Sequence, residues 1–304
     1  TDQWGGSYVN RMRFAMEVVQ AVRAAVGPNF IVIFRISAMD MLDGGLAWSE
    51  ILQLAHALEA AGVNIISTHF CWHEAPVPTI ATRVPRAAFT SVTGRLRQAL
   101  RIPVITSNRI NMPQVAEEVL ARGDADLVSM ARPMLADPEL VNKTRDGRED
   151  EINTCIACNQ ACLDHTFGRE QVTCLVNPRA CRETLLNYVP TTRPKKLAVV
   201  GAGPAGLAFA TTAAQRGHQV TLFEASGEIG GQFNLAKRIP GKEEFHETLR
   251  YFSRMLTLHG VVLKLSTLVD AELLQSQGFD EVVIATGITP RQPELEGIQH
   301  PKVV

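Results

Sequence analysis

Residues 196–225 read KLAVVGAGPAGLAFATTAAQRGHQVTLFEA, and this stretch decides the fold of the C-terminal part of the chain. Apolar runs at its two ends predict strands, and the Gly-x-Gly-x-x-Gly turn between them opens a helix. In such a unit Gly201 allows the tight turn, Gly203 lets backbone approach a pyrophosphate, and Gly206 permits close helix–strand packing. The sequence therefore predicts a βαβ dinucleotide-binding unit, with a glycine turn that holds no ligand as the alternative.

Further signals lie at the end of this unit and on both sides of it. Glu224 ends the second strand, eighteen residues after Gly206, where a carboxylate accepts hydrogen bonds from ribose hydroxyls and repels a 2′-phosphate. The first dinucleotide is therefore not expected to be NADP. EIGGQF (228–233) and VVIATG (282–287) add glycine-bearing turns, and LLNYVPTTRPKK, just upstream of the unit, is typical of a linker.

The N-terminal region, from about Thr1 to Gly147, alternates apolar runs with helical patterns. The predicted strands are 30–36, 64–70, 102–106 and 125–131, and the predicted helices are 13–26, 48–62, 112–123 and 137–147. Nearly continuous apolar strands in repeated βα units predict a parallel sheet covered on both faces. If the architecture is an eight-stranded βα barrel, these four strands are half of it, and we expect an internal piece of a longer protein.

Composition excludes several classes of protein. The chain is 46% hydrophobic and 20% charged with a formal net charge of −1, so it lacks the basic excess that phosphate backbones attract. It contains no apolar run of roughly 20 residues, and its N-terminus lacks the apolar core of a signal peptide. We therefore expect a cytoplasmic chain that binds neither nucleic acid nor a membrane.

Four of the six cysteines lie between residues 154 and 174. Three of them, spaced i, i+3 and i+7, fall within about 60° of arc on a helix, and the fourth follows after eleven residues. Four thiolates suit tetrahedral zinc or an iron–sulfur cluster, and three in one run with a distant fourth favour a 4Fe-4S cluster. Inert or redox thiols are the other alternative. Cys181 competes as the fourth ligand, and Cys71 is most simply a buried thiol.

The order of these motifs, a half barrel, CxxCxxxC with another Cys eleven residues on, and VVGAGPAG…FEA…GGQ…ATG, resembles a known family. This is the bacterial iron–sulfur flavoprotein type of 2,4-dienoyl-CoA reductase, a branch of the old yellow enzyme class related to trimethylamine dehydrogenase. The resemblance implies an α/β chain with FMN, FAD and a 4Fe-4S cluster, and NADPH as electron donor. The implied domains are the C-terminal half of an FMN-binding (β/α)8 TIM barrel, a 4Fe-4S segment with a linker, and the N-terminal part of a Rossmann-like FAD/NAD(P)-binding domain, at 1–147, 148–190 and 191–304.

The resemblance also assigns roles to individual residues. Arg35 in FRIS lies near the FMN ring, and Arg109 in SNRIN holds the FMN phosphate together with Ala131 and Arg132 in MARP. The cluster ligands are Cys155, Cys158, Cys162 and Cys174. The FAD-contacting positions are Gly201, Gly203, Ala205, Gly206, Glu224, Gln232, Lys242 and Val269.

His73 in CWHEA corresponds to the active-site histidine, which can relay a proton near neutral pH, while the tyrosine that donates the proton directly has no counterpart in this chain. The implied reaction is reduction of a small-molecule 2,4-dienoyl-CoA in fatty acid β-oxidation. Hydride passes from NADPH to FAD, electrons pass singly through the cluster to FMN, and FMN reduces the substrate. An amine dehydrogenase on the same scaffold is one alternative. A non-enzymatic, zinc-stabilised nucleotide-binding scaffold is another. The sequence predicts neither oligomeric state nor acyl chain length.

Overall fold

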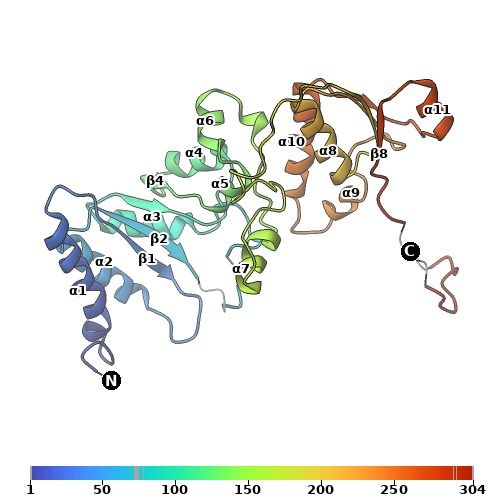
Figure 1. Ribbon diagram of the computed structural model, residues 1–304. Helices are drawn as coiled ribbons and strands as arrows, with labels where there is room; N and C mark the ends of the chain where they lie inside the picture. The colour runs from blue at the N-terminus through green and yellow to red at the C-terminus, as the bar shows by residue number, and fades with distance from the viewer. Residues whose placement is uncertain (1, 72–74, 78, 290, 292, 303–304) are drawn as a thin grey trace. The chain divides into compact units, whose positions relative to one another are not determined.

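Two separate parallel sheets form the framework of the protein in the computed structural model (Figure 1). The structure describes residues 2–71, 75–77, 79–289, 291 and 293–302. Contacts between residues divide the chain into two compact units. Unit 1 comprises Thr1–Asn187 and Arg238–Tyr251, and unit 2 comprises Tyr188–Lys237 and Phe252–Val304. The α/β class with parallel sheets is therefore confirmed.

The sheet of unit 1 has four strands in the order β1-β2-β3-β4, and every neighbouring pair is parallel. Its strands are β1 (Ile33–Met39), β2 (Ile65–Phe70), β3 (Val104–Thr106) and β4 (Leu127–Val128). The helices that precede and connect them are α1 (Tyr8–Val26), α2 (Trp48–Ala60), α3 (Thr90–Ala99) and α4 (Pro113–Ala121). The predicted strands and helices of this region are all present, with shifted ends.

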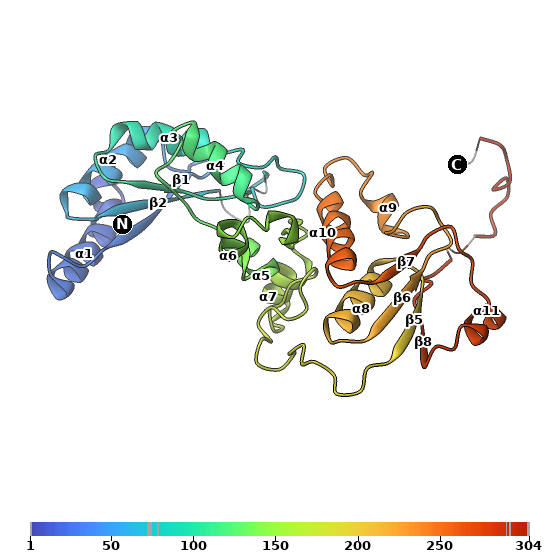
Figure 2. The same ribbon diagram turned by 90° about the horizontal axis from the view of Figure 1, so that it is seen from above.

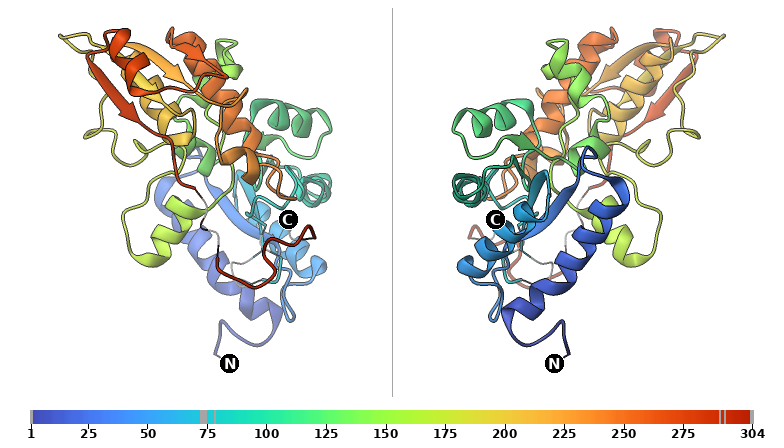
Figure 3. Two further views of the ribbon diagram at one scale, coloured as in Figure 1. Left: turned by 90° about the vertical axis from the view of Figure 1, so that its right-hand side faces the viewer. Right: turned by 90° about the vertical axis from the view of Figure 1, so that its left-hand side faces the viewer.

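One face of this sheet carries the core of the unit. Because side chains alternate along a strand, Ile36, Ile66 and Val104 all point to the face that α1, α2 and α3 cover (Figure 2). Helices α1 and α2 pack side by side (Figure 1 and Figure 3). Burial of each large apolar side chain in this core contributes roughly 1.5–3 kcal/mol to stability. On the other face Ile33 is 52% exposed, so the described residues leave that face of β1 partly open. The expectation of a sheet covered on both faces is not met within them.

Helix α3 was not predicted, because its sequence, TSVTGRLRQA, is rich in residues of low helix propensity. Burial supplies what propensity lacks, since Thr93 and Leu96 are completely buried on its inner side. A Cβ at Gly94 would lie 3.3 Å from the Cα of Asp124, so a glycine permits this close approach. Tertiary packing therefore decides this helix.

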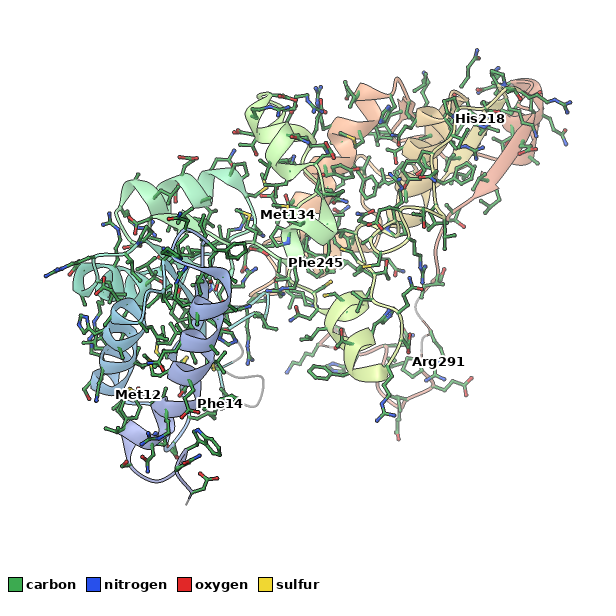
Figure 4. The ribbon with its side chains drawn as sticks, turned by 60° about the vertical axis from the view of Figure 1, so that its left-hand side comes forward. Met12, Phe14, Met134, His218, Phe245 and Arg291 are labelled. Carbon is green, nitrogen blue, oxygen red and sulfur yellow. The ribbon has the colours of Figure 1, made fainter. Side chains whose placement is uncertain are left out.

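Beyond β4 the chain of unit 1 becomes irregular. It forms short helices: α5 (Arg132–Ala136), α6 (Leu140–Arg145), the 3-10 turn η1 (Glu149–Glu151), the π-turn η2 (Gln160–Asp164) and α7 (His165–Gly168). Met112, Leu140 and Ile152 form a small core here, and Met134, labelled in Figure 4, packs against it. This core fixes the chain immediately before the first clustered cysteine.

Unit 2 contains a four-stranded parallel sheet in the order β7-β6-β5-β8. Its strands are β5 (Lys196–Val200), β6 (Gln219–Phe223), β7 (Val262–Lys264) and β8 (Glu281–Ile284). Helix α8 (Pro204–Gln215) connects β5 to β6 and packs on both, as Figure 2 shows. The predicted βαβ unit is confirmed. Short helices α9 (Phe233–Ala236) and α11 (Ala271–Ser276) complete the unit.

Helix α10 (Phe245–Leu258) belongs to both units, because the division of the chain falls between Tyr251 and Phe252. Its first half and the preceding residues from Arg238 pack with unit 1, although the chain on either side of this segment belongs to unit 2. Among the described residues, no helix combines the length and apolar character needed to cross a membrane.

Candidate cofactor sites

A hollow of about 630 Å³, open solvent included, lies in unit 1 beyond the ends of β3 and β4. The loops that follow these strands, 107–111 and 129–133, form much of its wall. In a parallel sheet the carboxyl ends of the strands share one edge, which is where such sheets bind ligands. The predicted FMN residues line this hollow together: Arg35, Arg109, Ala131 and Arg132.

Arg35 enters this hollow from the partly open face of β1, where its backbone is paired with Ser67. No hydrogen bond or ion pair joins its exposed side chain to any residue that the structure describes. A fixed cation with unused donors can hold an anion or stabilise negative charge on a ligand ring.

Arg109 is held differently, because only 2% of its side chain is exposed. Its guanidinium binds both carboxylate oxygens of Glu244, at 2.7 and 3.1 Å, and also donates to the carbonyl oxygens of Val84 and Thr82. Four of its five N–H groups are thus directed to protein acceptors, which leaves one for a phosphate. A phosphate-binding role of this side chain stays a prediction.

The backbone at this loop is strained. Asn108 and Arg109 both have left-handed φ values, 70° and 58°, which cost of order 1–3 kcal/mol each for residues other than glycine. Asn108 is fixed by bonds from its amide nitrogen to the Phe70 carbonyl and the Thr79 hydroxyl, at 3.4 and 2.9 Å. Consecutive strained residues at the end of a parallel strand are typical of a binding loop.

Asn111 lies at the inner end of the same loop and is 2% exposed. Its amide nitrogen donates to the Cys155 carbonyl at 2.8 Å, while its buried Oδ1 finds no hydrogen-bond partner among the described residues. Because the bond to a carbonyl fixes which end of the amide carries N–H groups, Oδ1 is an acceptor that a ligand hydroxyl could satisfy. Sequence reasoning did not single out this residue.

A second hollow of unit 1, of about 300 Å³ with open solvent included, is lined by four thiols. They belong to Cys155, Cys158, Cys162 and Cys174, the four residues predicted as ligands. Cys181 is exposed, and the predicted buried thiol, Cys71, is indeed buried. Within the described part of the chain, no three His, Cys, Asp or Glu side chains are grouped to hold one metal ion.

The chain around these cysteines is not a regular helix. Cys155 and Cys158 lie in extended or irregular backbone, while Cys162 lies in η2. Ala157 and Asn159 both have left-handed φ values, 51° and 61°, so the loop turns twice in a short distance. Two such turns bring thiols at i and i+3 to the same hollow without helical geometry.

Burial raises the pKa of the Cys155, Cys158 and Cys174 thiols, that of Cys174 to about 11. The Arg132 guanidinium opposes this by lowering the pKa of Cys155 and Cys158. At neutral pH these thiols keep their protons in the absence of metal, so metal binding would release protons. The predicted catalytic residue, His73, lies outside the described residues.

The glycine turn of unit 2 has the geometry that a dinucleotide cradle requires. At Gly201 (φ 103°) a Cβ would lie 2.4 Å from the Ala285 carbonyl oxygen, and at Gly206 it would lie 1.9 Å from the Gly201 carbonyl oxygen. No side chain fits at either position. At Gly203 a Cβ would meet nothing within 4 Å, so the turn is open where the middle glycine should admit a ligand.

Glu224 is bonded to this cradle. Its carboxylate accepts from the Ala202 N–H at 2.8 Å and from the N–H and hydroxyl of Ser226 at 2.9 and 3.0 Å. Burial raises the pKa of Glu224, but the N–H donors of Ser226 and Ala202 outweigh it and hold the pKa below its usual value. The Ala225 N–H also acts on this carboxylate, so a ribose hydroxyl would share its acceptor positions with these donors.

The other predicted FAD residues lie in different settings. Gln232 is exposed and donates to the Ile288 carbonyl at 2.7 Å, and Ala205 is exposed in the first turn of α8. Val269 is half-buried, in the loop before α11. Lys242 belongs to unit 1, where its ammonium lies 5.5 Å from the ring centre of Phe245, labelled in Figure 4.

Sequence reasoning missed the segment Arg238–Tyr251 as a part of unit 1. Glu244 binds Arg109 and, at 2.8 Å, Arg86, while Glu247 binds Arg86 and Arg250 at 3.3 and 2.6 Å. Arg250 in turn donates to the carbonyl oxygens of Asp150 and Ile152, each at 2.6 Å, just before the cysteine loop. Apart from the local Glu247–Arg250 pair, the partners are about 100 to 160 residues apart in the chain, so no local signal could have found them.

The arrangement identifies a class of protein. Residues 1–151 match the NADH:flavin oxidoreductase / NADH oxidase family, and residues 195–303 match the pyridine nucleotide-disulphide oxidoreductases. The chain belongs to the old yellow enzyme-like FMN oxidoreductases that carry a pyridine nucleotide-disulphide oxidoreductase domain. The predicted membership of the old yellow enzyme class and the predicted dinucleotide-binding type of domain are confirmed at the level of the family.

Relatives match along almost the whole chain. A metal reductase of Desulforamulus reducens is 44% identical over 98% of this chain and 46% of its own length. The structure of a 2-naphthoyl-CoA reductase bound to 2-naphthoyl-CoA matches with a TM-score of 0.95 and 37% identity, over 99% of this chain and 46% of that one. Histamine dehydrogenase from Rhizobium sp. 4-9 matches with a TM-score of 0.86 and 28% identity, over 96% and 43%. The chain spans about half the length of the curated relatives it matches.

Proposed function

We propose that the protein to which this chain belongs reduces a conjugated acyl-CoA thioester, specifically a 2,4-dienoyl-CoA of fatty acid β-oxidation, with electrons from NADPH. In this proposal the sheet of unit 1 is the C-terminal half of an eight-stranded FMN-binding barrel. The segment 148–190 holds a 4Fe-4S cluster, and residues 191–304 begin the FAD/NAD(P)-binding domain. The protein acts in the cytoplasm on a small-molecule substrate and without nucleic acid or membrane.

One observation carries the proposal. The hollow with four thiols and the hollow at the ends of β3 and β4 share two lining residues, Cys155 and Arg132. The hollow of the four thiols and the arginine-lined hollow, which suits a phosphate, thus share a wall within unit 1. Adjacent sites of this kind suit electron transfer between two bound redox groups better than they suit a structural zinc site.

The donor sets fit the three groups. A 4Fe-4S cluster is held by four thiolates, and four thiols line this hollow. Arg35 and Arg132 offer cations to the FMN ring and phosphate, and Oδ1 of Asn111 offers an acceptor to a ribityl hydroxyl. The open turn at Gly203 suits a pyrophosphate, and the Glu224 carboxylate next to it suits a ribose hydroxyl.

When bound, the flavins would supply hydride transfer and the cluster would supply single-electron transfer between them. The residues of the chain bind and orient these groups. The charge of Arg35 favours a negatively charged flavin ring, because the cation faces the hollow without a protein partner among the described residues. The Asn108–Arg109 loop, which forms part of the wall of the hollow, is anchored through the ion pair of Arg109 with Glu244.

The substrate class rests on the likeness to 2-naphthoyl-CoA reductase, whose substrate, like a dienoyl-CoA, is a conjugated thioester. The test begins with anaerobic iron, sulfide, zinc and flavin analysis of the full-length protein, followed by NADPH-driven assays with 2,4-dienoyl-CoA. We expect about four iron and four sulfide with one FMN and one FAD, and loss of dienoyl absorbance. Zinc without flavin would overturn the proposal.

The matched variant for this test is Cys158→Ser in the full-length protein. Because a serine oxygen is a poor ligand for iron in a cluster, we expect NADPH-driven turnover to fall by at least about a hundredfold while FMN stays bound. Cys181→Ser is the control, since Cys181 is exposed and is expected to leave turnover unchanged. Full turnover in Cys158→Ser would contradict the role of the cluster.

An amine dehydrogenase is the second candidate, favoured by the likeness to histamine dehydrogenase. The two candidates differ in the direction of electron flow. The same full-length protein should therefore be assayed with histamine or dimethylamine and an artificial electron acceptor. Amine-dependent reduction of the acceptor, without NADPH-dependent reduction of the thioester, would establish this candidate in place of the reductase.

A further inference from the structure

Arg132 occupies the wall between the two hollows of unit 1. It lines the hollow at the ends of β3 and β4 and also the hollow of the four thiols, and Cys155 is the only other described residue that lines both. The resemblance to the reductase family implied only a role at the FMN phosphate for Arg132. In the structure Arg132 also lies beside the hollow of the four thiols.

The cysteine loop itself holds this guanidinium in place. One Arg132 nitrogen, Nη1, donates to the Ile80 carbonyl at 2.9 Å and to the Asn159 side-chain oxygen. Asn159 directly follows Cys158 and has a left-handed φ of 61°. Its amide nitrogen also reaches the Ile80 carbonyl, at 3.4 Å. The cation is therefore anchored by neutral acceptors.

No carboxylate neutralises Arg132 among the residues that the structure describes, and its Nε and Nη2 make no hydrogen bond with them. The charge of Arg132 therefore acts on whatever fills the two hollows. Glu244, the nearby carboxylate, is itself paired with Arg109 and Arg86. Arg132 is therefore a positive charge on the wall that the two hollows share.

We propose that Arg132 is a positioning residue that sets the reduction potential of the cluster held by the four cysteines and couples it to the phosphate bound in the adjacent hollow. This inference rests on the proposed function. Reduction of a cluster adds one electron, so a fixed cation at its edge stabilises the reduced form and raises the potential. A phosphate group that pairs with the same guanidinium offsets part of its charge and lowers the potential.

The experiment is an anaerobic redox titration of the full-length protein, with the reduced cluster followed by electron paramagnetic resonance. We expect Arg132→Gln to lower the midpoint potential by about 59 mV, which is a tenfold change in the ratio of oxidised to reduced cluster for one electron. Arg132→Lys retains the charge and should stay near the wild-type value. Arg122→Gln, which removes an exposed arginine paired with Asp124, is the control and should not move the potential.

A second measurement needs no variant. The wild-type protein is depleted of FMN and reloaded with either FMN or riboflavin, which lacks the phosphate. The cluster potential should be lower with FMN than with riboflavin. This comparison remains decisive if Arg132→Gln fails to assemble the cluster.

The outcomes separate the inference from the proposed function. Wild-type iron content with equal potentials in Arg132→Gln and wild type, or equal potentials with FMN and riboflavin, would overturn the inference and leave the proposed function standing. Absence of iron from the wild-type protein would overturn the proposed function itself.

Discussion

The nucleotide cradle of unit 2 and the arginine-lined hollow of unit 1 are two solutions to binding a phosphorylated ligand. The cradle is made of backbone, and at Gly201 and Gly206 a single methyl group would collide with carbonyl oxygens. The hollow of unit 1 is lined by the cations Arg35, Arg109 and Arg132, of which Arg109 has a buried side chain. In the backbone site, one added methyl group should abolish ligand binding through a steric clash. In the side-chain site, loss of one charge should weaken ligand binding only in part.

Gly206→Ala should produce the largest effect, because its Cβ would lie 1.9 Å from the Gly201 carbonyl oxygen, and backbone must move to relieve the clash. We expect the free energy of unfolding of unit 2 to fall by more than about 3 kcal/mol, with loss of bound FAD. Gly203→Ala is the matched control, since a Cβ there meets nothing within 4 Å.

Gly203→Ala should fold normally and yet bind FAD more weakly, because its methyl group occupies space left for the ligand. Differential scanning calorimetry and the FAD content of the full-length protein measure the two effects. A Gly206→Ala protein as stable as wild type would contradict the expected steric clash in the backbone cradle.

Glu244→Gln should have the next largest effect. The substitution leaves Arg109, whose side chain is 2% exposed, as a buried cation without its carboxylate. Breaking a buried pair in this way costs about 3–5 kcal/mol. We expect unit 1 to lose stability by about 3 kcal/mol in chemical unfolding of the full-length protein.

Glu243→Gln provides the control for Glu244→Gln, because Glu243 is exposed and bonds only a local backbone N–H among the described residues. Its effect should stay within about 0.5 kcal/mol. Equal effects of the two substitutions would show that the buried pair does not hold the wall of the hollow.

Glu224→Gln should have the smallest effect and should depend on pH. The folded-state pKa of Glu224 is lowered, so its contribution is fully present above the unfolded pKa and is lost as the pH falls through the folded value. The stability difference between wild type and variant should therefore be constant from pH 7 to about pH 5 and smaller at pH 4. Urea unfolding midpoints at these pH values test this, and a difference that grows toward pH 4 would contradict it.

How well each of the two sites could be predicted depends on how close its residues lie to one another in the sequence. Gly201, Gly206 and Glu224 lie within one strand–turn–helix–strand, so their spacing alone predicted the cradle. The hollow of unit 1 gathers residues from β1, two loops and the cysteine segment. Periodicity predicted the strands that carry them, but only the resemblance to a family predicted that Arg35 and Arg132 share a site.

Other parts could not be predicted at all. The carboxylate partner of Arg109, Glu244, lies 135 residues further along the chain, and no pattern in either segment records the pairing. Helix α3 escaped detection because burial of Thr93 and Leu96 outweighs the low helix propensity of its sequence. No sequence pattern pointed to Asn111, because what distinguishes it is a buried Oδ1 without a hydrogen-bond partner among the described residues.

The return of residues 238–251 to unit 1 has a consequence for synthesis on the ribosome. When residue 187 has been made, Arg109 and Arg86 still lack Glu244, and the chain before the cysteine loop lacks Arg250. Unit 1 can reach its final state only after the first two strands of the other sheet and helix α8 have been translated. The order of synthesis therefore delays completion of the cysteine-bearing unit until part of the nucleotide-binding unit already exists.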